Sequence, residues 1–139
     1  MFGSPSIPVC VASIGRESTN QLGTAVPKEK RQWSLEAARA ILSDVRARTE
    51  EACEQVEALL GQVVDSEPES PEHQVADLEI QRIIASWARA MEALGLEVKG
   101  PWLVDFDCGS GLYCWRWPEE KLEYFHVYDE GFGGRIRIQ

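Results

Sequence analysis

The sequence contains no long apolar run, and this absence excludes a membrane-spanning helix. A helix needs about 20 consecutive apolar residues to cross a bilayer, and no stretch of the 139 residues approaches that length. The apolar stretch at residues 7–14 is interrupted by Pro8 and follows no basic residue, so we expect no signal peptide. The sequence therefore predicts a cytoplasmic protein that does not insert into membranes.

Cysteine pairs at metal-binding spacing are also missing. The chain has four cysteines, and no two of them form a Cys-x-x-Cys motif. They are spread over an N-terminal segment, a predicted helix and a predicted hairpin, at Cys10, Cys53, Cys108 and Cys114. This distribution argues against a disulfide scaffold, and no motif predicts a cofactor.

Positive charge is scarce where the chain is expected to fold. The formal net charge is −9. Residues 1–31 carry four basic and two acidic residues, which leaves ten basic and 21 acidic residues, a net charge of −11, in the rest of the chain. So acidic a domain repels nucleic-acid phosphates and anionic lipid surfaces, and we expect neither as a partner.

The periodicity of apolar residues divides the chain into an arm and a domain. Residues 1–31 are rich in Ser, Thr, Gly and Pro and have neither a helical nor a strand period, which predicts a flexible N-terminal arm. Residues 32–139 have both periods in succession. We expect them to form a single domain of ordinary size.

The domain begins with the pattern of a long helix over residues 34–64. Ser34 is a suitable N-cap, because its hydroxyl can accept a hydrogen bond from a free backbone N–H group. Apolar residues then recur at alternating steps of three and four, and only the polar Thr49 interrupts them. This heptad spacing is typical of a coiled-coil seam.

A second helix is predicted over residues 73–94. The acidic, proline-containing segment 65–72 separates it from the first helix, and Gly95 follows where a left-handed C-terminal cap belongs. Its apolar residues also recur at steps of four and three. Two such helices joined by a short loop are expected to pack as an antiparallel helical hairpin.

After the second helix the period of the apolar residues changes to two. Residues 102–106, 112–117 and 122–128 alternate as strands do, and short turns separate them. Ile136 and Ile138 indicate a fourth short strand. The predicted fold class is therefore α+β, a long antiparallel helical hairpin followed by a three- to four-stranded antiparallel β-meander.

Five short motifs in this domain resemble those of a bacterial family catalogued as domain of unknown function 2203. They are Ser34-Leu35-Glu36-Ala37-Ala38, Val104-Asp105-Phe106, Leu112-Tyr113-Cys114-Trp115-Arg116, Tyr124-Phe125-His126 and Gly131-Phe132-Gly133-Gly134-Arg135. The likeness covers roughly residues 33–138. Phe125 stands where a Trp is more usual in the family, and Pro118 where a Gly is commoner. The resemblance implies no activity, because the family is uncharacterised.

Side chains alternate between the two faces of a strand, which sorts the strand residues into two sets. The apolar set, expected to pack on the helices, comprises Trp102, Val104, Phe106, Tyr113, Trp115, Trp117, Phe125 and Val127. The more polar set, expected to line a cleft, comprises Leu103, Asp105, Leu112, Cys114, Arg116, Leu122, Tyr124, His126 and Tyr128. A shift of one residue would exchange the two faces, so few registers are consistent with this pattern.

One simple register pairs Asp105 with Cys114 and Cys114 with His126. Residues opposed in antiparallel strands have Cβ atoms about 4.5–5.5 Å apart, so this row would place a thiol between an imidazole and a carboxylate. The three side chains can then hold a divalent metal such as zinc, or activate Cys114 as a nucleophile. Alternatively Cys114 is a small buried apolar residue and His126 a hydrogen-bonded strand residue.

Three further residues are candidates for binding an anionic ligand, namely Arg116, Tyr124 and Arg135. Glycines before Arg135 allow backbone N–H groups to approach an anion closely. However, no helix follows this turn to add its dipole. The simpler interpretation is a turn with glycines at positive φ, in which Arg135 pairs with an acid such as Asp129 or Glu130.

Several apolar residues lie beside the helical seams and mark a candidate interface. They are Ile41, Leu60, Ile84 and Met91. Our first hypothesis is a non-enzymatic interaction or scaffold module that forms a homodimer through its hairpin. The alternative is a small metal- or ligand-binding domain or enzyme that uses Cys114, His126 and Asp105. The sequence alone does not decide whether the protein is an enzyme.

Overall fold

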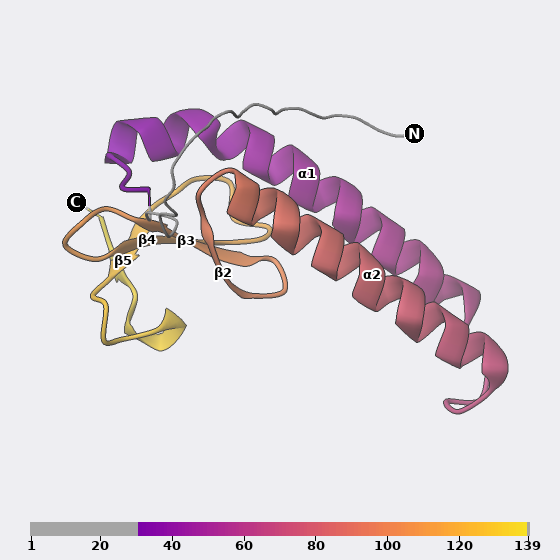
Figure 1. The fold of residues 1–139 in the computed structure, drawn as a ribbon. Helices are drawn as coiled ribbons and strands as arrows, with labels where there is room; N and C mark the ends of the chain where they lie inside the picture. The colour runs from indigo at the N-terminus through magenta and orange to yellow at the C-terminus, as the bar shows by residue number, and fades with distance from the viewer. Residues whose placement is uncertain (1–30, 139) are drawn as a thin grey trace, which may run out of the picture. The chain divides into compact units, whose positions relative to one another are not determined.

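A computed structural model describes residues 31–138, and the elements within this range are two helices followed by a five-stranded antiparallel sheet (Figure 1). The α+β class predicted from the sequence is confirmed. The predictions for residues 1–30, including the flexible arm and Cys10, lie outside the described residues. No helix within residues 31–138 is long and apolar enough to cross a membrane.

Helix α1 spans Leu35–Gln62, and helix α2 spans Pro71–Ala93. The hydroxyl of Ser34 accepts a hydrogen bond from the backbone N–H of Ala37 at 3.0 Å, so α1 begins as predicted. Ser70 caps α2 in the same way, and Pro71 occupies its first turn, where no backbone N–H is needed. The second helix therefore begins two residues earlier than predicted.

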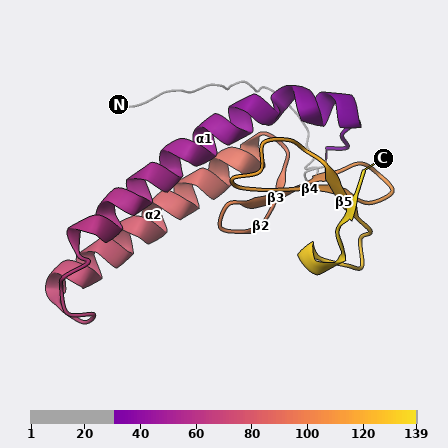
Figure 2. The ribbon, with the colours of Figure 1, turned by 180° about the vertical axis from the view of Figure 1, so that it is seen from behind.

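The two helices pack as an antiparallel hairpin, which both views of the molecule show (Figures 1 and 2). Residues at the predicted seam positions of α1 are buried, among them Ala38, Leu42, Val45, Thr49 and Ala52. The buried Thr49 joins the helices: its hydroxyl accepts a hydrogen bond from the indole N–H of Trp87 at 2.8 Å and donates one to the carbonyl of Val45 at 2.7 Å. The polar residue in the seam is therefore fully bonded.

The sheet has the strand order β2-β3-β4-β5-β6, so each strand pairs with its neighbour in the sequence. The strands are β2 (Glu97–Gly100), β3 (Leu103–Asp107), β4 (Leu112–Arg116), β5 (Tyr124–His126) and β6 (Ile136–Arg137). Strand β6 corresponds to the expected fourth strand. Strand β2 is an addition, because no strand was predicted before residue 102.

The strand predicted over residues 122–128 is much shorter in the structure. Leu122 lies before β5 and is fully buried in the hydrophobic core, not on the polar face. Val127 lies after β5 and is 46 % exposed, not packed on the helices. Trp102 also lies outside its predicted strand, in the turn after β2 at φ 65°, yet its ring contacts Trp87 edge to face at 5.0 Å.

One face of the sheet packs on the helices and the other does not. Val104, Phe106 and Trp115 are fully buried in one cluster with residues of α1 and α2. On the opposite side of the sheet lies the short helical turn η2 (Phe132–Gly134), which both ribbon views place away from the hairpin (Figures 1 and 2). The polar residues of the second face therefore lie between the sheet and the last segment of the chain.

Candidate metal centre

Asp105, Cys114 and His126 come from three consecutive strands and share the face that points away from the helices. Asp105 lies opposite Cys114, as predicted. The predicted pairing of Cys114 with His126 is wrong, because Cys114 lies opposite Tyr124 and His126 opposite Leu112. The error is two residues, and side chains alternate with a period of two, so the three residues still share one face.

The three side chains form a compact, buried group. The ring Nε2 of His126 lies 3.0 Å from Oδ2 of Asp105. One ligand atom from each of the three residues lies within 4.8 Å of the other two. Asp105 and Cys114 are each 1 % exposed, and His126 is 3 % exposed. A carboxylate, a thiol and an imidazole are thus brought together with almost no access to bulk water.

The hydrogen bonds of His126 determine which ring nitrogen faces the group. Its Nδ1 lies 3.0 Å from the carbonyl oxygen of Val127. A carbonyl only accepts hydrogen bonds, so Nδ1 carries a hydrogen, and in the neutral ring Nε2 then has a lone pair. This lone pair points at Asp105, which as a carboxylate is also an acceptor. A proton or a cation between the two atoms is needed to make their contact favourable.

The remaining carboxylate oxygen of Asp105 has no such partner. Its Oδ1 is buried and receives no hydrogen bond from residues 31–138. Burial raises the pKa of Asp105 above its ordinary value, because the charged form loses its hydration. Unbonded buried oxygens are uncommon in folded proteins, so this oxygen is a candidate ligand atom.

Cys114 is not prepared to act as a free nucleophile. Burial, and then the charge of Asp105, raise the pKa of its thiol to about 12. The thiol is therefore protonated near neutral pH. Nucleophilic cysteines need a lowered pKa or a base that takes the proton, and here both nitrogens of His126 lie against other groups. Without a base that takes its proton, the thiol of Cys114 is a weak nucleophile.

The group opens into a pocket of about 470 Å³. Besides the three candidate ligands, the pocket is lined by apolar residues of the sheet and of η2, by a lysine of β2 and by two acidic residues after β5. They are, in this order, Leu103, Leu112, Phe132, Lys99, Asp129 and Glu130. Lys99 and Phe132 were not identified from the sequence, because β2 was not predicted and nothing in the glycine-rich turn indicated that it folds back over the sheet.

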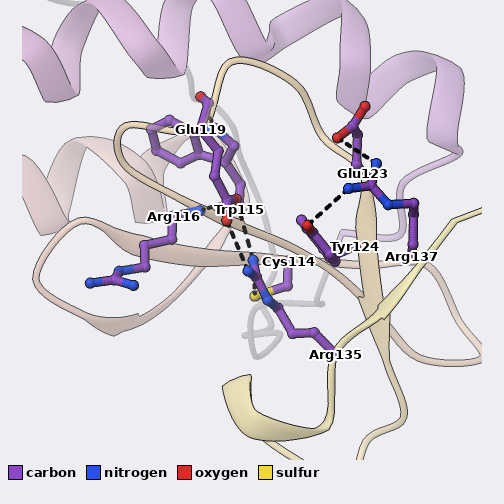
Figure 3. Close-up of polar contacts among 8 residues, drawn as sticks. All are labelled: Cys114, Trp115, Arg116, Glu119, Glu123, Tyr124, Arg135 and Arg137. Carbon is purple, nitrogen blue, oxygen red and sulfur yellow. Dashed lines mark hydrogen bonds and ion pairs between the residues drawn. The ribbon is translucent and has the colours of Figure 1, made fainter.

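Arg135 lies beside Cys114, and its guanidinium is directed at the sulfur (Figure 3). Its guanidinium pairs with Glu119, with Nη2 to Oε2 at 2.8 Å, and the prediction that Asp129 or Glu130 would be its partner is wrong. The glycines before it do not adopt positive φ; among the glycines of residues 31–138, only Gly95 and Gly109 do. Glu119 was missed because it lies in the connection between β4 and β5, outside any periodic pattern.

Arg116 and Tyr124 are also not among the residues that line the pocket. The exposed guanidinium of Arg116 points away from Cys114 and lies over the ring of Phe132 at 5.4 Å (Figure 3). The ring of Tyr124 lies between Arg135 and Arg137, at 4.0 and 5.3 Å. The three residues proposed to bind an anion thus do not converge on the pocket.

The candidate interface residues on the hairpin separate into two groups. Met91 is 0 % exposed and belongs to the core, so it is not available to a second chain. Ile41 is half-buried and packs against that core. Ile84 is half-buried, and Leu60 is 49 % exposed. Only the last two remain accessible candidates.

Comparison with known proteins identifies one family. The family model described as an uncharacterized conserved protein, DUF2203, matches residues 31–138. The match includes all of the helices and strands and all three candidate ligands. No curated protein and no solved structure matches the chain.

Proposed function

Since the chain belongs to the DUF2203 family of uncharacterised conserved proteins, we propose its function from the geometry of the site alone: the domain binds one divalent transition-metal ion, with zinc the favoured ion. Asp105, Cys114 and His126 are the proposed ligands. The observation that carries the proposal is the grouping of their ligand atoms within 4.8 Å in a buried site where Oδ1 of Asp105 has no hydrogen-bond partner.

The donor types and their spacing support zinc. Zinc is bound by cysteine sulfur, histidine nitrogen and carboxylate oxygen at about 2.0–2.3 Å, so the ligand atoms of a tetrahedral site lie about 3.4–3.6 Å apart. The more distant atoms of the present group, up to 4.8 Å apart, need to approach by about 1 Å, and Nε2 of His126 and Oδ2 of Asp105, 3.0 Å apart, need to separate slightly. Small rotations of the Cys114 and Asp105 side chains can provide this.

The surroundings of His126 also support a metal. Metal-binding histidines commonly donate their second ring N–H to a carbonyl or carboxylate, which orients the ring. The contact between Nδ1 and the carbonyl of Val127 has this form. A cation at the centre would also neutralise the buried carboxylate and thiolate.

Three protein ligands leave one position of a tetrahedral ion open. Structural zinc sites usually have four protein ligands, whereas sites that bind water or substrate have three. The pocket of about 470 Å³ adjoins the three ligands and can admit a small molecule to the fourth position. We therefore propose a site that binds an exogenous ligand at the metal. Because the thiol must remain reduced, the proposal places the protein in the cytoplasm.

Metal titration tests the proposal. The full chain, freed of metal with a chelator, is expected to bind one zinc or cobalt(II) ion, counted by elemental analysis after gel filtration. Cys114→Ser and His126→Asn are each expected to weaken binding by at least about tenfold. Cys108→Ser is the matched control, because this thiol is half-buried and outside the group. A wild-type chain that retains no metal, or a Cys114→Ser chain that binds as tightly as wild type, contradicts the proposal.

A second candidate function is self-association through the hairpin. Large apolar side chains near the turn of the hairpin are exposed by 49–74 %; they are Leu60, Val64, Val75 and Leu78. The hairpin extends beyond the sheet there, so the sheet does not cover them (Figure 1). These exposed residues support a second copy of the chain as the partner.

A further inference from the structure

The metal site as proposed leaves without a role a largely buried charged residue that lies beside it, namely Arg135. Its side chain is only 13 % exposed. It enters from the segment between η2 and β6, far along the chain from the strand that carries Cys114, and reaches back over that strand (Figure 3). Burying a guanidinium is unfavourable unless its charge and its N–H groups are satisfied.

Four groups surround the guanidinium of Arg135. Two aromatic rings lie against it, Tyr124 at 4.0 Å and Phe132 at 4.1 Å. On its edge, Nη2 donates to Oε2 of Glu119 at 2.8 Å and Nη1 donates to Oε1 at 3.3 Å. Nη1 also donates to Sγ of Cys114 at 3.9 Å. The planar group is therefore fixed in orientation with one N–H directed at the sulfur.

Glu119 is itself held in place by hydrogen bonds, so its contacts with Arg135 are fixed in position. Its Oε1 accepts a hydrogen bond from the backbone N–H of Arg116 at 3.0 Å, and its carbonyl accepts one from the indole of Trp115 at 2.9 Å (Figure 3). Both donors follow Cys114 in β4, Trp115 directly and Arg116 one residue later. The position of the Arg135 guanidinium is thus tied to the strand that carries the sulfur.

Hydrogen bonds to a metal-bound sulfur withdraw electron density from it and orient it, and groups that bond to ligands tune a metal site. Resting on the proposed metal site, the geometry points to Arg135 as a positioning residue of the centre, whose N–H···S bond holds the Cys114 sulfur toward the ion and sets the electron density on it. A purely structural Arg135 would join the last segment to the sheet without affecting the sulfur.

Arg137 provides a matched control. It lies two residues further on, contacts the ring of Tyr124 at 5.3 Å and pairs with Glu123 at 3.0 Å. It therefore shares the charge, the aromatic contact and the ion pair of Arg135. Among the contacts of residues 31–138, it has none with the sulfur. Because the side chain of Arg137 is 59 % exposed and that of Arg135 is 13 % exposed, Arg137→Gln controls for the loss of charge and of one aromatic contact, and the position of the sulfur-to-metal band then reports the N–H···S bond.

Cobalt(II) substitution tests the inference, because the sulfur-to-cobalt charge-transfer band reports electron density on the thiolate. In the full wild-type chain loaded with cobalt(II), this band must appear, and its absence contradicts the proposed metal function, not the role of Arg135. In Arg135→Gln the band is expected to shift to longer wavelength, with cobalt affinity about 10- to 100-fold weaker. In Arg137→Gln neither is expected to change.

Two results overturn the inference. One is an Arg135→Gln chain whose band position and cobalt affinity match those of wild type, and the other is an Arg137→Gln chain that shifts the band equally. If Arg135→Gln does not fold, Arg135→Lys provides the test, because its ammonium keeps the charge but cannot bridge Glu119 and the sulfur together. It is expected to shift the band in the same direction, and an unshifted band overturns the inference as well.

Discussion

Two buried polar residues on the same chain show why hydrogen-bond satisfaction distinguishes a structural group from a candidate site. The hydroxyl of Thr49 is fully buried, and it both donates and accepts a hydrogen bond. The carboxylate of Asp105 is equally buried, but its Oδ1 has no partner within residues 31–138 and its Oδ2 faces a ring nitrogen. Thr49 is therefore explained by the fold, whereas the free Oδ1 of Asp105 makes this residue a candidate ligand.

Protonation of Cys114 makes metal binding depend on pH. The pKa of its thiol is about 12 in the metal-free protein, so the thiol carries its proton at neutral pH and zinc must displace it. Apparent zinc affinity is therefore expected to rise with pH, by about tenfold per pH unit for each proton displaced. The raised pKa of Asp105 acts in the same direction, because its carboxyl must also be ionised to bind.

Titration calorimetry in buffers of different ionisation enthalpy counts the displaced protons. At least one proton is expected per zinc at about neutral pH, and affinity is expected to be higher at about pH 8 than at about pH 6. The Cys114→Ser chain should release fewer protons. An affinity that does not change over this range would show that the sulfur is not a ligand.

Periodicity predicted the elements well where a full pattern was available, and poorly at short or irregular ends. The heptad spacing located both helices, and the two-residue period placed Asp105, Cys114 and His126 on one face. Strand β2 has only four residues, and a turn of Pro101 and Trp102 follows it at once, so too little alternation was present to detect it. The alternation of side chains between the two faces also cannot distinguish registers that differ by two residues. This is why Cys114 was paired with His126 and not with Tyr124.

The contacts of Arg135 were beyond prediction for a different reason. Its partners Glu119, Tyr124 and Phe132 lie in three separate segments, two of them outside any strand. Their meeting depends on how the chain folds back after β5, and no local propensity encodes that path. Local patterns thus predicted the ligand residues but not the residues that surround them.

The link between the helices gives a prediction at the scale of the element. Thr49→Val keeps the shape of the side chain but removes the acceptor of the Trp87 indole N–H, which then remains buried and unbonded. The expected loss is about 1–3 kcal/mol in the free energy of unfolding, measured by urea denaturation. In a Trp87→Phe background the same substitution should cost less, because no indole N–H is left unpaired. Equal costs in both backgrounds would show that the hydrogen bond does not stabilise the hairpin.

On the scale of the whole molecule, the hairpin extends past the sheet and leaves apolar side chains uncovered (Figure 2). Burying these side chains would stabilise a second chain bound at this end. The sheet face with the proposed metal lies elsewhere in the fold. Metal binding and self-association can therefore be tested independently in the same protein.

Ile84→Glu and Leu60→Glu are expected to lower the mass of the assembled protein in multi-angle light scattering while the circular dichroism spectrum remains unchanged. The physical reason is that each substitution adds an unpaired charge to the apolar surface of the hairpin. Ser43→Glu adds the same charge to α1 at an exposed position 17 residues before Leu60, away from the turn of the hairpin, and it should leave the mass unchanged. A wild-type chain that stays monomeric at high concentration excludes self-association.

The strand order of the sheet follows the chain without a crossover, and this bears on how the protein reaches its folded state. The outermost proposed ligands are only 21 residues apart in sequence, so bringing them together closes a short loop at a small entropic cost. An ion bound by these three residues would hold β3, β4 and β5 in register before the helices pack on the sheet. The metal would then act as a folding template as well as a component of the finished site.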